Sequence, residues 1–232
     1  NRPEAGQGVH ALRPRDDDLG ATHVKLTEWL SRKLPSAQGI QLSPLKRPAA
    51  GFSNETYICD LTYRQGAEER REQIVVRMEP KYRVFPEYDL ERQYLIMDRL
   101  AGSNVPVPHV RWYEADRSVL GCSFYVMDKI EGEIPPEVPP YHAFGMLFDA
   151  APERREKIWW NGLDVLARVH ALDWRKLGLD FLGAPGGGTD PIDRQLDYYG
   201  RYLEWVKEKE PQPTLDASFK WLRENRYAPK RV

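Results

Sequence analysis

The change in apolar spacing at Gly132 constrains the fold more than any other feature of this sequence. Between residue 40 and Gly132, short β-branched or aromatic runs alternate with polar segments and with one helical pattern; beyond it, apolar residues recur only at helical spacing. Strands and helices that are segregated along a chain are typical of α+β proteins, because the sheet and the helical part then pack as separate layers. The sequence therefore predicts a sheet-containing part joined to an all-helical part.

Five segments have strand composition, rich in β-branched and aromatic residues and bounded by turn residues. They are Ile40 to Leu45, Thr56 to Tyr63, Gln73 to Met78, 109–114 and 122–130. The first three are separated by the Gly-led turn GFSN and by the polar stretch RQGAEERRE, which favours hairpin connections. The sequence therefore predicts an antiparallel sheet of about five strands.

Helical spacing of apolar residues predicts the other elements. The stripe of residues 23–34 consists of Val24, Trp29, Leu30 and Leu34, and that of residues 87–101 consists of Leu90, Tyr94, Met97 and Leu100. The prolines of VPVP at 105–108 end the second helix. After a proline-rich loop, three helices are predicted, over 151–172, about 191–208 and about 214–225.

These elements divide the 232 residues into three parts. We predict an N-terminal arm and helix over 1–38, a lobe with the sheet and one helix over 39–132, and a partial helical lobe over 133–232. The apolar residues, 41% of the chain, are enough for a packed core. Two lobes with a short linker predict a ligand cleft at their joint.

Charge and hydropathy argue against two classes of partner. The formal net charge is −1, whereas a nucleic-acid binder normally has a basic excess. No apolar run approaches the ~18 residues of a membrane span, and the N-terminus lacks the apolar core of a signal peptide. Cys59 and Cys122 each lie in an apolar run; the sequence leaves a disulfide open but favours two buried thiols in a reducing compartment. A cytoplasmic protein with no nucleic-acid or membrane partner is expected.

The segment GFSNETYIC at 51–59 is the first candidate for chemistry. Glycine lets backbone N–H groups approach an anion, and Ser53, Asn54 and Thr56 add hydroxyl and amide donors. The same residue types also build ordinary hairpin turns. This segment alone does not separate a phosphate loop from a plain turn.

Arg77 and the helix over 87–101 form the second candidate. Arg77 is a lone cation in an apolar strand; such cations usually point to water, but a position just after the hairpin also suits a contact with phosphates. On the helical wheel, Gln93 falls within the apolar stripe, whereas Glu91 lies on its flank. We therefore expect Gln93 to be buried and to accept a hydrogen bond from Arg77, with Glu91 in solvent.

The segment FYVMDKIEG at 124–132 is the third candidate. A buried strand that runs into a short polar linker leaves backbone N–H and C=O groups with which the edge of an adenine can pair. An edge strand that ends in a loop has the same sequence character, so both interpretations stay open.

The order and spacing of these segments are more informative than any one of them. Together GFSNETY, IVVRMEP, LERQYLIMDRLAGSNVPVPHV, FYVMDKIEG and LARVHALDW resemble the aminoglycoside phosphotransferase-like kinase family. The resemblance is closest to mycobacterial members and to kinase domains fused to acyl-CoA dehydrogenases, and it covers roughly residues 39–226. It implies an α+β, protein-kinase-like two-lobe fold with an antiparallel five-stranded N-lobe. It also implies an ATP-dependent phosphotransferase that acts on a hydroxyl of a small-molecule alcohol.

The resemblance assigns roles to individual residues. The ATP phosphates would be covered by the loop residues Gly51, Phe52, Ser53, Asn54 and Thr56. Arg77 takes the place of the usual strand lysine, and Gln93 stands where the family usually has glutamate. Met127 corresponds to the gatekeeper, while the Asp128 carbonyl and the Ile130 N–H would pair with adenine.

One departure from the family concerns catalysis. The family's catalytic loop has the pattern G-D-x-x-x-x-N, whose Asp is the base and whose Asn holds Mg²⁺ together with a later Asp. No D-x-x-x-x-N occurs in this sequence. We therefore expect a parent protein that uses ATP and Mg²⁺, with the metal ligands beyond residue 232, and a chain that has no catalytic residue and is inactive alone. The alternative is a non-catalytic nucleotide-binding or scaffolding module of kinase-like fold.

Overall fold

The computed structural model describes residues 16–48, 55–80, 88–136, 139–183, 190–208 and 210–226. The chain forms two compact units, one of residues 1–82 and 89–172 and the other of residues 83–88 and 173–232. The first unit contains the sheet, and the second contains the last two helices. The lobe boundaries predicted after residues 38 and 132 stay predictions.

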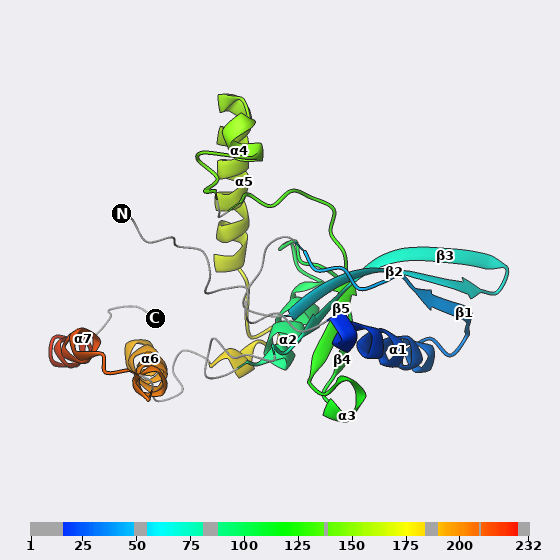
Figure 1. The fold of residues 1–232 in the computed structure, drawn as a ribbon. Helices are drawn as coiled ribbons and strands as arrows, with labels where there is room; N and C mark the ends of the chain where they lie inside the picture. The colour runs from blue at the N-terminus through cyan, green and yellow to red at the C-terminus, as the bar shows by residue number, and fades with distance from the viewer. Residues whose placement is uncertain are drawn as a thin grey trace, which may run out of the picture. The chain divides into compact units, whose positions relative to one another are not determined.

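The first unit is built on the five-stranded antiparallel sheet that the sequence predicts (Figure 1). Its order is β1-β2-β3-β5-β4. The strands are β1 (Ala37–Leu42), β2 (Glu55–Gln65), β3 (Glu68–Met78), β4 (Val110–Glu114) and β5 (Phe124–Asp128). The three central strands β2, β3 and β5 contain four of the ten predicted site residues, namely Thr56, Arg77, Met127 and Asp128.

The β2–β3 hairpin extends through the polar stretch that the sequence analysis placed between strands. The two strands pair without interruption from Glu55↔Met78 to Gln65↔Glu68. Gly66, with a φ of +63°, makes the tight turn between them. Polar side chains also pair across the hairpin: the Tyr63 hydroxyl donates to Glu72 at 3.1 Å. The predicted strand ends were wrong here because a backbone ladder with cross-strand polar pairs needs no apolar residues.

Helix α1 (Asp16–Lys33) covers one face of the sheet. It starts earlier than the predicted residue 23, and its core-facing residues are Leu26, Trp29 and Leu30, each at most 1% exposed. The Trp29 ring packs edge-on against Phe124 at a centroid distance of 4.8 Å, and its indole N–H donates to Glu114 at 2.7 Å. Val24 is 55% exposed. Its predicted place in the core stripe was wrong.

Helix α2 (Leu90–Leu100) packs against the opposite face of the sheet. Phe124 and Val126 of β5 belong to the cluster under α1, whereas Tyr125 belongs to the cluster under α2; alternate residues of a strand point to opposite faces. The Asp89 side chain caps the helix by accepting from the Arg92 N–H at 2.8 Å. The predicted packing of this helix across one face is confirmed.

Six further helical segments complete the described chain. They are α3 (Arg117–Leu120), α4 (Met146–Asp149), α5 (Pro152–His170), the 3-10 turn Asp180–Leu182, α6 (Pro191–Lys207) and α7 (Pro213–Glu224). The long helices α5, α6 and α7 match the predicted ranges to within two residues at each end. In the second unit, α6 and α7 are joined by an ion pair between Lys207 and Asp216 at 2.8 Å. None of the helices within the described ranges has the length and apolar character of a membrane span.

Both thiols are expected to resist labelling in the folded protein. Cys59 and Cys122 are free; burial raises the pKa of Cys59 to about 12 and that of Cys122 to about 11. Because thiols react as thiolates, both should label far more slowly at pH 8 than an unperturbed cysteine. Cys122, which is less buried, should react first. Timed maleimide labelling with and without denaturant tests this, and rapid labelling of native Cys59 would contradict the burial.

Candidate functional site

Two cross-strand rows of side chains lie on the face of the sheet that packs against α2. One row is apolar and consists of Ile58, Val75 and Met127, paired in register across β2, β3 and β5. The second row is Thr56, Arg77 and Tyr125, paired in the same way. The rows are two residues apart along each strand, which corresponds to about 7 Å. An apolar surface therefore lies beside a hydroxyl and a guanidinium on one sheet face.

This arrangement suits the two chemically different ends of a nucleotide. A planar base needs an apolar surface, and the row with Met127 provides one; Val75 is only 7% exposed, while Ile58 and Met127 are half-buried. Phosphates need fixed donors, and the half-buried Arg77 guanidinium can donate two parallel N–H bonds to an anion. The residues present fit ATP. Gly51, Phe52, Ser53 and Asn54 lie outside the described residues, so their predicted role stays a prediction.

Tyr125 is the most deeply buried member of the two rows. Its side chain is 0% exposed and packs with Leu90 and Val110 under α2. Burial raises the pKa of the Tyr125 phenol, and the neighbouring Arg77 guanidinium lowers that pKa in part. The sequence analysis missed this residue because an aromatic residue in an apolar strand is typical of any core.

Gln93 is less exposed than Glu91, as predicted, but Gln93 is not buried. Glu91 is exposed and Gln93 is half-buried. Full burial of Gln93 was therefore a wrong prediction: Leu90 is the buried residue of this part of the helix, and Gln93 lies at the edge of the stripe. Within the described ranges, the Gln93 side chain makes no hydrogen bond. Its predicted bond to Arg77 stays a prediction.

The backbone N–H groups around the linker after β5 differ in whether they are already hydrogen-bonded. The Asp128 N–H donates to the His109 carbonyl at 2.8 Å, and the Lys129 N–H donates to the Gln73 carbonyl at 3.2 Å. By contrast, the Ile130 N–H has no hydrogen bond to any described residue, and its side chain is 63% exposed. The Ile130 amide is thus free to donate to a ligand, and its predicted pairing with adenine stays a prediction.

The Asp128 side chain lies on the face of the sheet under α1, where it forms ion pairs. Asp128 pairs in register with Ile74, a residue of the core under α1. Its carboxylate forms ion pairs with Arg111 and with His109, the latter at 3.2 Å, and Arg111 also pairs with Glu72. Only the main chain of Asp128 is therefore left for the predicted contact with adenine.

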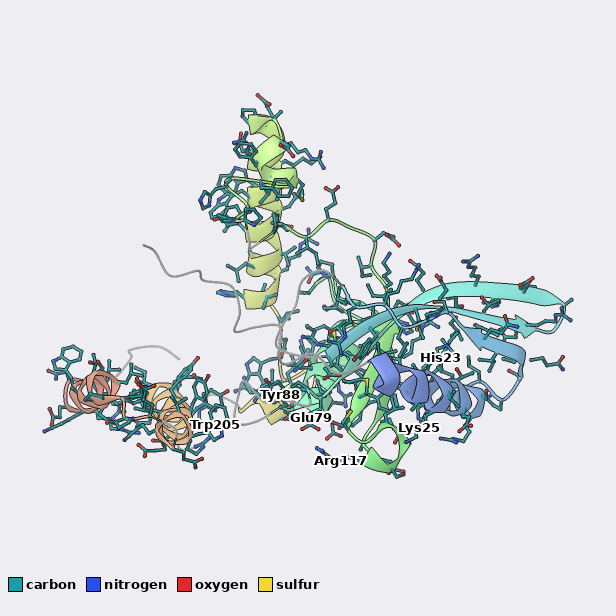
Figure 2. All side chains as sticks on the ribbon, in the orientation of Figure 1. His23, Lys25, Glu79, Tyr88, Arg117 and Trp205 are labelled. Carbon is teal, nitrogen blue, oxygen red and sulfur yellow. The ribbon has the colours of Figure 1, made fainter. Side chains whose placement is uncertain are left out.

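An ion pair between a buried carboxylate and an exposed arginine at the end of β3 was not predicted from the sequence. Glu79 is 7% exposed, and its carboxylate lies 2.7 Å from the guanidinium of Arg117 on α3 (Figure 2). The Glu79 N–H also donates to the Ser123 carbonyl at 3.2 Å. These contacts fix the end of β3 two residues after Arg77. The only sequence signal was an acidic residue directly after an apolar run.

No metal site is found in the part of the chain that the structure describes. There, no three His, Cys, Asp or Glu side chains gather as metal ligands. We assign none of the described residues to Mg²⁺.

Comparisons with known proteins agree with this geometry. The sequence profile of the "Phosphotransferase enzyme family" (APH) matches residues 44–232. Acyl-CoA dehydrogenase family member 10 of Mus musculus is 31% identical over 74% of this chain, and acyl-CoA dehydrogenase family member 11 of Gallus gallus is 26% identical over 93% of it. The chain spans only 14% and 26% of the length of these two relatives.

A solved structure also has the same fold. It is a crystal structure from Ralstonia eutropha JMP134 of a protein assigned as an aminoglycoside phosphotransferase. The two chains superpose with a TM-score of 0.56 and 25% sequence identity, over 90% of this chain and 54% of the other. The five-stranded antiparallel sheet with its helices is therefore the sheet of a kinase-like phosphotransferase fold.

Proposed function

The chain belongs to the phosphotransferase enzyme family, and we propose that it forms the ATP-binding lobe of a small-molecule kinase together with part of the substrate lobe. The phosphoryl acceptor is proposed to be a hydroxyl group of a small-molecule alcohol. Adenine would lie on the apolar row and pair with the Ile130 amide, while Arg77 holds the phosphates.

The single observation that carries this proposal is the register of β2, β3 and β5. It places the apolar row with Met127 and the polar row with Arg77 on one sheet face, about 7 Å apart. On the face under α1, strand residues at the centre of the sheet such as Cys59, Ile74 and Val76 are buried beneath the helix and are not available to a ligand. The proposed nucleotide site therefore lies on the face under α2.

A non-catalytic nucleotide-binding module is the second candidate function. The absence of any D-x-x-x-x-N in the 232 residues favours it for this chain taken alone. Both candidates bind ATP on the same face, so binding does not separate them. They differ in phosphoryl transfer by the parent protein, which an acceptor-dependent assay of ADP release measures directly.

Replacement of Arg77 tests the proposed site. We expect Arg77→Ala to weaken ATP binding about tenfold or more, because a charge-assisted hydrogen bond contributes roughly 1.5–3 kcal/mol. Arg77→Lys should retain part of the affinity, since lysine keeps the charge but loses the two-pronged contact. Wild-type binding should weaken with added salt and should change little with Mg²⁺. Isothermal titration calorimetry with ATP, at two salt concentrations and with or without Mg²⁺, measures all three effects.

The matched control is Arg70→Ala on the same strand. Arg70 is exposed, lies near the hairpin turn and pairs with Glu68 at 3.2 Å. The Arg70→Ala substitution removes the same charge as Arg77→Ala, but far from the proposed site, and should leave ATP affinity unchanged. Equal affinities for the Arg70 and Arg77 variants would count against the proposed site, and tight binding that depends on Mg²⁺ would reveal a metal site in this chain.

A further inference from the structure

The hydroxyl of Tyr125 is a buried polar group that makes no well-formed hydrogen bond with a described residue. Among the described residues that are not exposed, it is the buried side-chain oxygen or nitrogen that makes no hydrogen bond. Such groups are rare in folded proteins, because a hydroxyl removed from water loses its hydrogen bonds without replacement. A group of this kind points to a partner that comes into place when the protein works.

The surroundings of Tyr125 restrict what that partner can be. Leu90 and Val110 pack against it, and the ring of Tyr94 lies 6.4 Å from its own. These neighbours offer no charged group. Across the strand pair, the Cα partner of Tyr125 is Arg77, which points to the same face of the sheet. The effect of Arg77 on the pKa of the phenol agrees with this proximity.

We propose that Tyr125 is a positioning residue for Arg77, whose guanidinium donates a hydrogen bond to the Tyr125 hydroxyl while its other N–H groups hold the phosphates of the nucleotide. A guanidinium has five N–H donors, so one can contact the phenol oxygen while two others contact a phosphate. Tyr125 would thereby do what the family resemblance assigns to the helix residue at position 93. This inference rests on the proposed function.

The phenol is better placed for this role than Gln93. Tyr125 lies on the strand next to Arg77 and is held by packing on all sides, so its hydroxyl has a fixed position. Gln93 is half-buried at the edge of α2, where its flexible side chain makes no hydrogen bond with a described residue. A rigid acceptor orders a guanidinium at lower entropic cost than a flexible one.

The test is Tyr125→Phe, which removes one oxygen atom and keeps the packing. Because the hydroxyl makes no well-formed hydrogen bond with a described residue, the melting temperature should change little. ATP affinity should fall about fivefold to tenfold. Tyr113→Phe is the matched control: Tyr113 is the next tyrosine along the same row, in register with Tyr125 on β4, and its loss of a hydroxyl should leave ATP affinity unchanged.

A double-mutant cycle shows whether Tyr125 acts through Arg77. In an Arg77→Ala background, Tyr125→Phe should weaken ATP binding no further. The tyrosine 13Cζ NMR signal of Tyr125 in the wild-type chain should shift when ATP is added, and in Arg77→Ala it should not. This spectroscopic readout needs no tyrosine variant and would not respond to a merely structural role.

Each outcome decides the matter. Wild-type affinity in Tyr125→Phe, an equal loss in the Arg77→Ala background, or an unmoved Tyr125 signal on ATP binding overturns the inference and leaves the proposed function standing. Failure of the wild-type chain to bind ATP at all overturns the proposed function and this inference together.

Discussion

The 232-residue chain is expected to transfer no measurable phosphate from ATP to a hydroxyl acceptor. A kinase of this family needs an aspartate base and metal-binding Asn and Asp residues. The loop pattern D-x-x-x-x-N needs an aspartate five positions before the asparagine. No asparagine of this chain meets that condition: the residues at that distance are Ala49 for Asn54, Arg99 for Asn104, Glu156 for Asn161 and Lys220 for Asn225. Loss of catalytic groups of this kind commonly lowers the rate by several orders of magnitude. A coupled assay of ADP release, with a panel of small-molecule alcohols, measures this.

The control for this experiment is Arg77→Ala. A trace of contaminating kinase gives the same background rate in both preparations, whereas genuine turnover falls when Arg77 is lost. Turnover of about 1–100 s⁻¹, as in ordinary kinases, that also depends on Arg77 would show that this chain supplies a base we have not identified. In that case the interpretation of the missing loop is wrong.

The second large effect is expected at Trp29. Replacing this fully packed indole by alanine should destabilise the first unit by about 3–5 kcal/mol, since it leaves a cavity under the sheet. The ring is 1% exposed and contacts both Phe124 and Trp112. Urea unfolding followed by circular dichroism measures the loss. Trp221→Ala is the control, because Trp221 of α7 is 61% exposed and should contribute little. Equal effects at the two tryptophans would contradict the packing described for α1.

Trp29→Phe isolates the hydrogen bond to Glu114. That bond is the largest of the effects that lower the pKa of Glu114 in the folded protein. A depressed folded-state pKa stabilises the protein above the unfolded-state pKa of about 4.3, and this contribution disappears as the pH falls through the folded-state value. The stability difference between wild type and Trp29→Phe should therefore be largest near neutral pH and shrink in acid.

The sequence predicted the elements better than their ends. The helix of Leu90, Tyr94 and Met97 was found because a regular apolar stripe is a long-range signal repeated over three turns. The ends of β2 and β3 were missed because their outer pairs are held by backbone bonds and polar contacts, for which apolar periodicity gives no signal. Val24 was misplaced because the spacing was judged too loosely: at 100° per residue it lies on the opposite side of the helix from Trp29 and Leu30, whereas Leu26 lies on their side.

The site was predicted residue by residue, but its arrangement was not. Thr56, Arg77 and Met127 could be named from local motifs and from the family resemblance. Their common face depends on strand register, which is set by pairing between segments far apart in the sequence. For the same reason, nothing in the sequence indicated that Tyr125 is the neighbour of Arg77 or that the Asp128 carboxylate is bound to Arg111.

Because side chains alternate between the two faces of β2, substitutions at neighbouring positions of this strand are expected to have different effects. Tyr57, Cys59 and Leu61 face α1 and are at most 2% exposed, so a change there is felt as lost folding. Thr56 and Ile58 face the proposed nucleotide site, so we expect a change there to alter ligand binding more than folding. Natural selection for folding stability and natural selection for ligand binding can therefore act almost independently on adjacent codons. Such a strand can adapt to a new ligand without first weakening the scaffold that presents it.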